Sequence, residues 1–271
     1  MLKKTLIAFF GLIFSAGHAL AQNFNLTDGM TAEEKGLAIA IEADRRDHGF
    51  QDSAADLTMI LKNRNGDESI RNLRIETLEV PAEDQGDKSM VVFDRPRDVK
   101  GTALLTFSNI LEPDEQWMFL PALKRVKRIS SVNKSGPFMG SEFAYEDMAS
   151  QEVGKYRHVY RSEEACGDFT CYKVERIPLY EHSGYTKQIA WIDTVEFRTQ
   201  KVEFYDRRET LLKTLIAGDH RQYLGQFWRA HDLFMENHQT GKTTRLLWDA
   251  FRFQAGLNER DFSRASLQRA R

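Results

Sequence analysis

Apolar and polar residues alternate in short runs along most of this chain, and Gly, Pro and Asn residues separate the runs. The alternation is clear at 57–61 and again at 73–77. Between these runs, Asn65-Gly66 predicts a hairpin turn in which both central residues must accept a positive φ. A period of two is typical of β-strands. We therefore predict a twisted antiparallel sheet of about eleven strands.

Helix signals are fewer. Thr31-Ala-Glu-Glu34 has the spacing of a capping box, in which the Thr hydroxyl and the Glu carboxylate satisfy the first amides of a helix. It predicts a helix over residues 31–48. Leu37 and Ile41 lie one turn apart, and we expect this pair to pack on the sheet. Shorter helices are predicted at 141–148 and 261–268.

Large apolar side chains occur on both faces of several predicted strands. Trp117 and Phe119 point one way, whereas Met118 and Leu120 point the other. A sheet with one solvated face alternates more cleanly, so either helices cover the second face or a cavity lies there. The aromatic residues could form the wall of a site for an apolar guest, or simply an ordinary core. The candidates for that wall are Phe93, Phe107, Trp117, Phe119, Phe138, Phe143, Trp191 and Phe204.

Several motifs occur in the order found in one protein family. They are Phe93-x-x-Pro96 with Gly101, Trp117-Met-Phe-Leu-Pro121, Phe138-x-Gly140-Ser-x-Phe143, Trp191-Ile-Asp193, Lys201-Val-Glu-Phe-Tyr-Asp206 and Phe262-Ser263. Over most of its length the sequence resembles the LolA-like family of outer-membrane lipoprotein-sorting proteins, in its broader periplasmic lipid-carrier branch.

This resemblance implies an α+β fold, a strongly curved antiparallel half-barrel with helices covering its concave face. It also implies a carrier of lipid or lipoprotein acyl chains, in which the helix with Leu37 and Ile41 acts as a lid. Relatives of this branch are often associated with membrane transporters of the resistance-nodulation-division (RND) type. Such a transporter is therefore an expected donor or acceptor of the cargo.

The N-terminus has the features of a secretory signal peptide. Lys3 and Lys4 precede an apolar stretch over residues 5–14, and Ala19-Leu-Ala21 resembles a cleavage site. A membrane anchor is the alternative, but the apolar run is well short of the roughly 20 residues needed to cross a bilayer. We therefore expect a signal peptide at 1–21 and a single mature domain at 22–271, exported to the periplasm as a soluble monomer.

Charge and cysteine content narrow the function further. The chain has 38 Lys and Arg against 40 Asp and Glu, a balance that argues against a nucleic-acid binder. Cys166 and Cys171 are the two cysteines, and in an exported protein their close spacing predicts a structural disulfide. A thioredoxin-type site would have two intervening residues rather than four, and no partner pair for a zinc site lies nearby.

Lys124, Arg125, Lys127 and Arg128 form the densest basic cluster. One interpretation is an edge strand that uses charge to prevent sheet-to-sheet pairing. The other is a rim that contacts lipid headgroups or an acidic partner. The sequence alone leaves both open.

Catalytic motifs are incomplete. Thr240-Gly-Lys-Thr243 resembles the end of a phosphate loop, but Glu236 stands where the first glycine is required. The histidines lack metal-ligand spacing, and no Gly-x-Ser-x-Gly elbow occurs. We therefore predict a carrier that is not an enzyme and needs no metal or cofactor. The alternatives are a non-carrying periplasmic adaptor of an RND-type transporter and, less favoured, a lipid-ester hydrolase.

Overall fold

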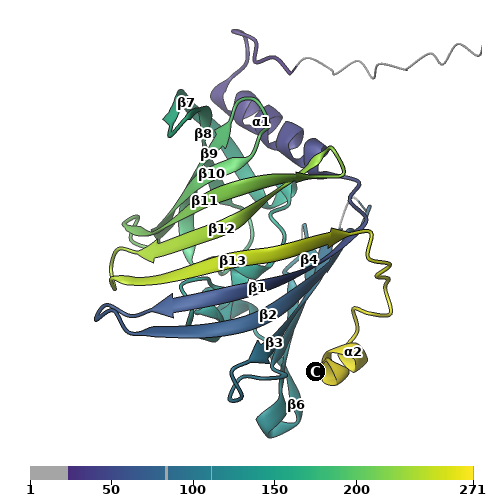
Figure 1. The fold of residues 1–271 in the computed structure, drawn as a ribbon. Coiled ribbons are helices and arrows are strands. Elements are labelled where there is room, and N and C mark those ends of the chain that lie inside the picture. Colours follow the sequence, from purple (N-terminus) through teal and green to yellow (C-terminus); the bar gives the residue numbers. More distant parts are fainter. Residues whose placement is uncertain (1–23, 83–84, 111, 271) are drawn as a thin grey trace, which may run out of the picture.

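Thirteen strands form one continuous antiparallel sheet, which curves strongly without closing (Figure 1). The computed structural model describes residues 24–82, 85–110 and 112–270; the expected signal peptide lies outside these residues. The strands are β1 (Asp52–Lys62), β2 (Glu68–Leu78), β3 (Gln85–Arg95), β4 (Ala103–Asn109), β5 (Glu115–Leu120), β6 (Arg125–Ile129), β7 (Tyr156–Cys166), β8 (Phe169–Pro178), β9 (Tyr185–Asp193), β10 (Thr199–Asp206), β11 (Leu211–Tyr223), β12 (Phe227–Asn237) and β13 (Lys242–Phe253).

The order across the sheet is β6-β5-β4-β3-β2-β1-β13-β12-β11-β10-β9-β8-β7. The chain therefore builds one half from β1 outward to β6 and then the other half from β7 back to β13, which pairs with β1. The expected curved antiparallel sheet is confirmed, with thirteen strands rather than about eleven. The turn after β1 is also present, but of its residues 63–66 only Gly66 has a positive φ, 95°. The expectation of a positive φ at Asn65 was wrong.

The first helix, α1 (Ala32–Asp47), begins where the capping box predicts. The Thr31 hydroxyl accepts from the Glu34 amide at 3.2 Å, and the Glu34 carboxylate accepts from the Thr31 amide at 2.7 Å. The face that packs on the sheet is different from the predicted one. Leu37 and Ile41 are 44% and 51% exposed, whereas Gly36 and Ile39 are buried.

The reason for this difference is the close approach of α1 to β7. A Cβ atom at Gly36 would lie only 2.7 Å from the Tyr160 backbone nitrogen. The helix therefore turns its smallest residue toward the strand, and the Leu37/Ile41 stripe faces away. Helix α1 contacts mainly β7, with few contacts to β8 and β12, so it covers one margin of the sheet (Figure 1).

The concave face is covered mainly by residues 130–155, which we call the connector because they join β6 to β7. The connector contains the 3₁₀ turns η2 (Ser131–Asn133), η3 (Phe138–Gly140), η4 (Tyr145–Met148) and η5 (Val153–Lys155). The short helix predicted at 141–148 is present only in its second half, as the 3₁₀ helix η4. The expected cap at Ser141 is wrong, because the Ser141 hydroxyl donates to the Phe138 carbonyl at 2.7 Å and closes a tight turn.

The sheet has an apolar cluster on each face. The inner cluster lies on the concave face and includes Leu57, Met59, Leu73, Phe93, Leu104, Phe138, Phe143, Tyr185, Phe204, Met235 and Leu246. The outer cluster, on the opposite face of β3–β5, comprises Met90, Val92, Ala103, Leu105, Trp117, Phe262 and Leu267. The second helix, α2 (Arg264–Arg269), covers the outer cluster and is capped by Ser263, close to the predicted 261–268.

The predicted disulfide is present between Cys166 and Cys171, where it ties the tip of the β7–β8 hairpin. No helix among the described residues is long and apolar enough to span a membrane.

Candidate functional site

The eight aromatic candidates are divided between the two faces of the sheet. Phe93, Phe138, Phe143 and Phe204 belong to the inner cluster. Trp117 belongs to the outer cluster, and Phe107 and Phe119 pack against it. Trp191 also faces outward, where its indole N–H donates to Glu164 at 2.7 Å. The sequence predicted that these residues form one wall. The structure instead places them on two faces, because adjacent residues of a strand point to opposite sides of the sheet.

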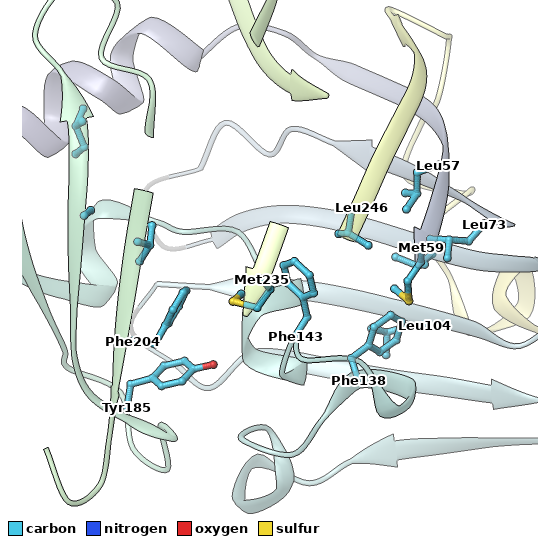
Figure 2. Close-up of a cluster of buried hydrophobic side chains, with 14 of the residues drawn as sticks. Leu57, Met59, Leu73, Leu104, Phe138, Phe143, Tyr185, Phe204, Met235 and Leu246 are labelled. Carbon is cyan, nitrogen blue, oxygen red and sulfur yellow. The ribbon is translucent and has the colours of Figure 1, made fainter. Parts of the chain in front are cut away.

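Connector side chains occupy the middle of the concave face (Figure 2). The Phe138 ring lies 5.7 Å from the ring of Phe93 and 5.7 Å from that of Tyr145, measured between centroids. Phe143 lies beside Met235 in the same cluster (Figure 2). We expected an apolar cavity beneath helices. In the described residues, the connector instead covers the apolar concave face.

A single carboxylate holds both ends of the connector. Asp114, in the loop between β4 and β5, lies 2.8 Å from the Lys155 ammonium and 3.6 Å from that of Lys134. All three side chains are at least nine-tenths buried. Buried ion pairs of this kind are strongly destabilising to break by removing one partner, because a charge is then left without compensation.

The middle of the connector is held by Glu146 and Asp147. Glu146 accepts hydrogen bonds from the Gly184 amide at 2.8 Å, the Ser183 hydroxyl at 2.8 Å and the Tyr180 hydroxyl at 3.1 Å. Burial, and to a lesser extent the neighbouring Asp147 carboxylate, raise the pKa of Glu146 above its usual value. These contacts tie η4 to the loop before β9.

Two cations from the sheet also hold the connector. The Lys213 ammonium donates to the Asp147 carboxylate at 2.6 Å and to the Glu142 carbonyl at 2.7 Å. Arg71 donates to the Met139 carbonyl at 2.6 Å. Further contacts come from Gln116, Thr244 and Asn237, so the connector is held above an apolar surface by many discrete polar contacts.

The basic cluster lies on and beside β6, which is an edge strand of the sheet. This position agrees with the edge-protection interpretation, and Arg128 pairs with Glu115 at 2.8 Å. Lys124 also lines a surface hollow of about 510 Å³ together with Lys100, Gly101, Phe119, Pro121 and Gln268. A second hollow of about 520 Å³ lies next to Arg128 and Asp114. Both are away from the centre of the inner cluster.

Comparison with known proteins identifies the family. A family model described as that of an uncharacterized protein matches residues 85–269. A crystal structure from Vibrio parahaemolyticus, described as an outer membrane lipoprotein-sorting protein domain, is 52% identical with a TM-score of 0.85. The match covers 87% of this chain and 99% of the Vibrio chain. The chain belongs to the LolA-like family.

Other LolA-like neighbours are more distant. A DUF1329 family protein from Desulfovibrio piger is 27% identical, with a TM-score of 0.83 and coverage of 88% of this chain and 100% of the other. A LolA superfamily protein from Nitrosomonas europaea shares the fold at 21% identity, with a TM-score of 0.68 and coverage of 88% and 99%. None of the curated proteins matches the sequence.

Sequence reasoning missed the polar residues that organise the concave face, among them Asp114, Glu146 and Lys213. A usable signal exists for Lys213. It occupies the same strand phase as Leu215, which packs against the inner cluster, so a charge stands at a position where the alternation calls for an apolar residue. No comparable signal marks Asp114 and Glu146, which lie in irregular segments.

Proposed function

We propose that this LolA-like protein carries acyl chains of lipids or lipoproteins through the periplasm, and that the chains bind to the concave face when the connector moves away from it. The observation that carries the proposal is the nature of the cover. An apolar surface on a large curved sheet is shielded mainly by short 3₁₀ turns and loops, which polar contacts hold in place. The family and its resemblance to a lipoprotein-sorting domain support the same assignment.

The energies involved are compatible with reversible exchange. Burying a methylene group contributes about 0.8 kcal/mol, so one long acyl chain gains on the order of 10 kcal/mol. The connector buries Phe138 and Phe143 and partly buries Met139 and Met148 in the inner cluster. Fully burying such a side chain is worth about 1.5–3 kcal/mol, so the four together contribute at most roughly 12 kcal/mol. The apolar burial that the cargo gains is therefore of the same order as the apolar burial that the connector gives up, and the polar contacts of the connector add to the cost of opening.

Lipid analysis of the native protein tests this function. The full chain is expressed in a gram-negative host, purified from the periplasm without detergent, and extracted for mass spectrometry. We expect acyl lipid in near-stoichiometric amount. The same protein, delipidated and refolded, should take up a fluorescent fatty acid. Protein that is repeatedly empty and takes up no fatty acid would contradict the proposal.

A pair of charge substitutions then locates the site. Phe204 lies in the inner cluster on β10, and Phe119 packs against the outer cluster on β5. A carboxylate cannot be buried against an acyl chain without a large cost. Phe204→Asp should therefore abolish uptake in a variant that circular dichroism shows to be folded, whereas Phe119→Asp should retain it. Equal uptake by the two variants would place the acyl chain elsewhere.

A further inference from the structure

Arg176 is a half-buried cation that has no acidic partner among the described residues. It lies on β8 in the same strand phase as Val174, a member of the inner cluster, and so faces the concave side. Its Nη2 donates to the Gln188 side-chain oxygen at 2.8 Å, whereas its Nε is buried without an acceptor. The guanidinium lies 5.6 Å from the centre of the Tyr156 ring. Burial lowers the pKa of Arg176, but arginine keeps its charge at neutral pH.

The other side of the same hairpin shows the contrast. Arg161 of β7 pairs with Glu175 of β8 through two contacts, at 2.8 and 3.2 Å. Glu175 is the sequence neighbour of Arg176, so the two side chains lie on opposite faces of β8. The buried lysines at the connector, Lys155 and Lys213, also have carboxylate partners. An unpaired guanidinium is therefore not a general feature of the cations that this protein buries.

Arg176 is part of a row of polar residues across three strands. It pairs in register with His158 of β7 on one side and with Gln188 of β9 on the other. His158 places Nε2 3.0 Å from the Val153 carbonyl, and its Nδ1 is buried without a partner. Gln188 in turn pairs in register with Phe204 of β10. The row therefore presents one unsatisfied donor, the Arg176 Nε–H, at the border of the apolar inner cluster, whereas His158 donates through Nε2 and leaves Nδ1 as an acceptor.

We propose that Arg176 and Gln188 bind the anionic headgroup of the cargo, with the Arg176 guanidinium donating to a phosphate or carboxylate oxygen while the tail lies on the inner cluster. This inference rests on the proposed carrier function and adds its ligand class. A guanidinium matches the geometry of two oxygens of a phosphate or carboxylate. A buried donor without an acceptor destabilises the empty protein, and an anionic headgroup supplies the acceptor that is missing.

The test compares lipids that share a tail and differ in charge. Delipidated protein is titrated with dipalmitoyl phosphatidylglycerol and with dipalmitoylglycerol, which lacks the phosphate. A second pair, palmitate and hexadecanol, presents a carboxylate and a neutral hydroxyl. We expect Arg176→Gln to weaken binding of the anionic member of at least one pair about tenfold, and to leave its neutral counterpart within about twofold. The pair that responds identifies phosphate or carboxylate as the headgroup.

Arg161→Gln is the matched control, since it removes an arginine from the same hairpin on the opposite face, and it should leave both pairs unchanged. Arg176→Lys retains the charge but loses the planar fork, so it should weaken binding of the anionic lipid by less than the glutamine variant does and leave the neutral lipid unchanged. If the glutamine variant does not fold, this selective loss supports the inference and an unchanged anionic affinity overturns it. Equal loss for anionic and neutral lipids, or no loss for either, would overturn this inference alone. Failure of the wild-type protein to bind any of the four lipids would instead overturn the proposed function.

Discussion

Phe138 offers the sharpest test of whether the connector is a displaceable cover or part of the lipid-binding wall. Its side chain is fully buried in the inner cluster, between Phe93 of the sheet and Tyr145 of the connector itself. Replacement of a buried Phe by Ala typically costs about 3–5 kcal/mol of folding stability. If the connector covers the site, the same truncation also lowers the cost of lifting it.

The size of the binding effect follows from the neighbours of Phe138. Contacts with the sheet are lost on opening, whereas contacts within the connector need not be, so we assign about half of the cost to opening. The opening equilibrium would then shift by about 1.5–2.5 kcal/mol, which tightens acyl-lipid binding by roughly 10- to 70-fold. A residue that instead contacts the lipid would weaken binding when it is truncated.

The assay combines urea denaturation with titration of a fluorescent fatty acid. Phe262→Ala is the matched control, because Phe262 is also buried, at 2% exposure, but lies in the outer cluster. Both variants should lose a similar amount of stability, and only Phe138→Ala should bind lipid more tightly. Weaker binding by Phe138→Ala, or equal binding by the two variants, would refute the idea of a displaceable cover.

Three further predictions concern stability. Burial and the nearby Glu152 raise the pKa of Asp87 to about 7. Between about pH 4 and pH 7 the folded protein therefore keeps a proton on Asp87 that the unfolded chain has released. Folding stability consequently falls as the pH rises through this range. The advantage of Asp87→Asn in urea denaturation should therefore grow by about 2.5 kcal/mol between pH 5 and pH 8, and an advantage independent of pH would contradict this assignment. Lys213→Met leaves the buried Asp147 carboxylate unpaired and should cost about 3–5 kcal/mol in denaturation, part of which Asp147→Asn restores in the double variant; strict additivity would argue against the pair. Gly36→Ala should lower Tm despite the better helix propensity of Ala, because the new methyl group meets the β7 backbone; an unchanged or higher Tm would show that α1 can move away.

Local patterns predicted the local features of this fold well. Alternation identified the strands, the Thr31–Glu34 box marked the start of α1, and the spacing of Cys166 and Cys171 indicated the disulfide. Each of these features depends on residues close together in the chain. The packed face of α1 depends instead on how closely the helix approaches β7, a strand more than 100 residues away, and the sequence pattern carries no record of that distance.

The assignment of faces could not be predicted for a related reason. The side chains on both faces of β5 are apolar, so the sequence predicts that each face is covered but not which segment covers it. The connector covers Met118, whereas the C-terminal segment with Phe262 covers Trp117. Either assignment satisfies the local pattern, and the choice is made by contacts between distant segments.

The density of basic residues in the sequence does not indicate which of them lie at the candidate site. The basic residues that cluster at 124–128 lie on or beside an exposed edge strand, where charge discourages pairing with another sheet. Lys213 and Arg176 stand alone in the sequence, yet each places a cation at a concave-face position where an apolar residue would be expected to stabilise the empty protein better. Lys213 has an evident use, because it holds the connector through Asp147. Arg176 has no such partner, and a cation kept on an apolar face without one is best explained by an anionic group that arrives with the cargo.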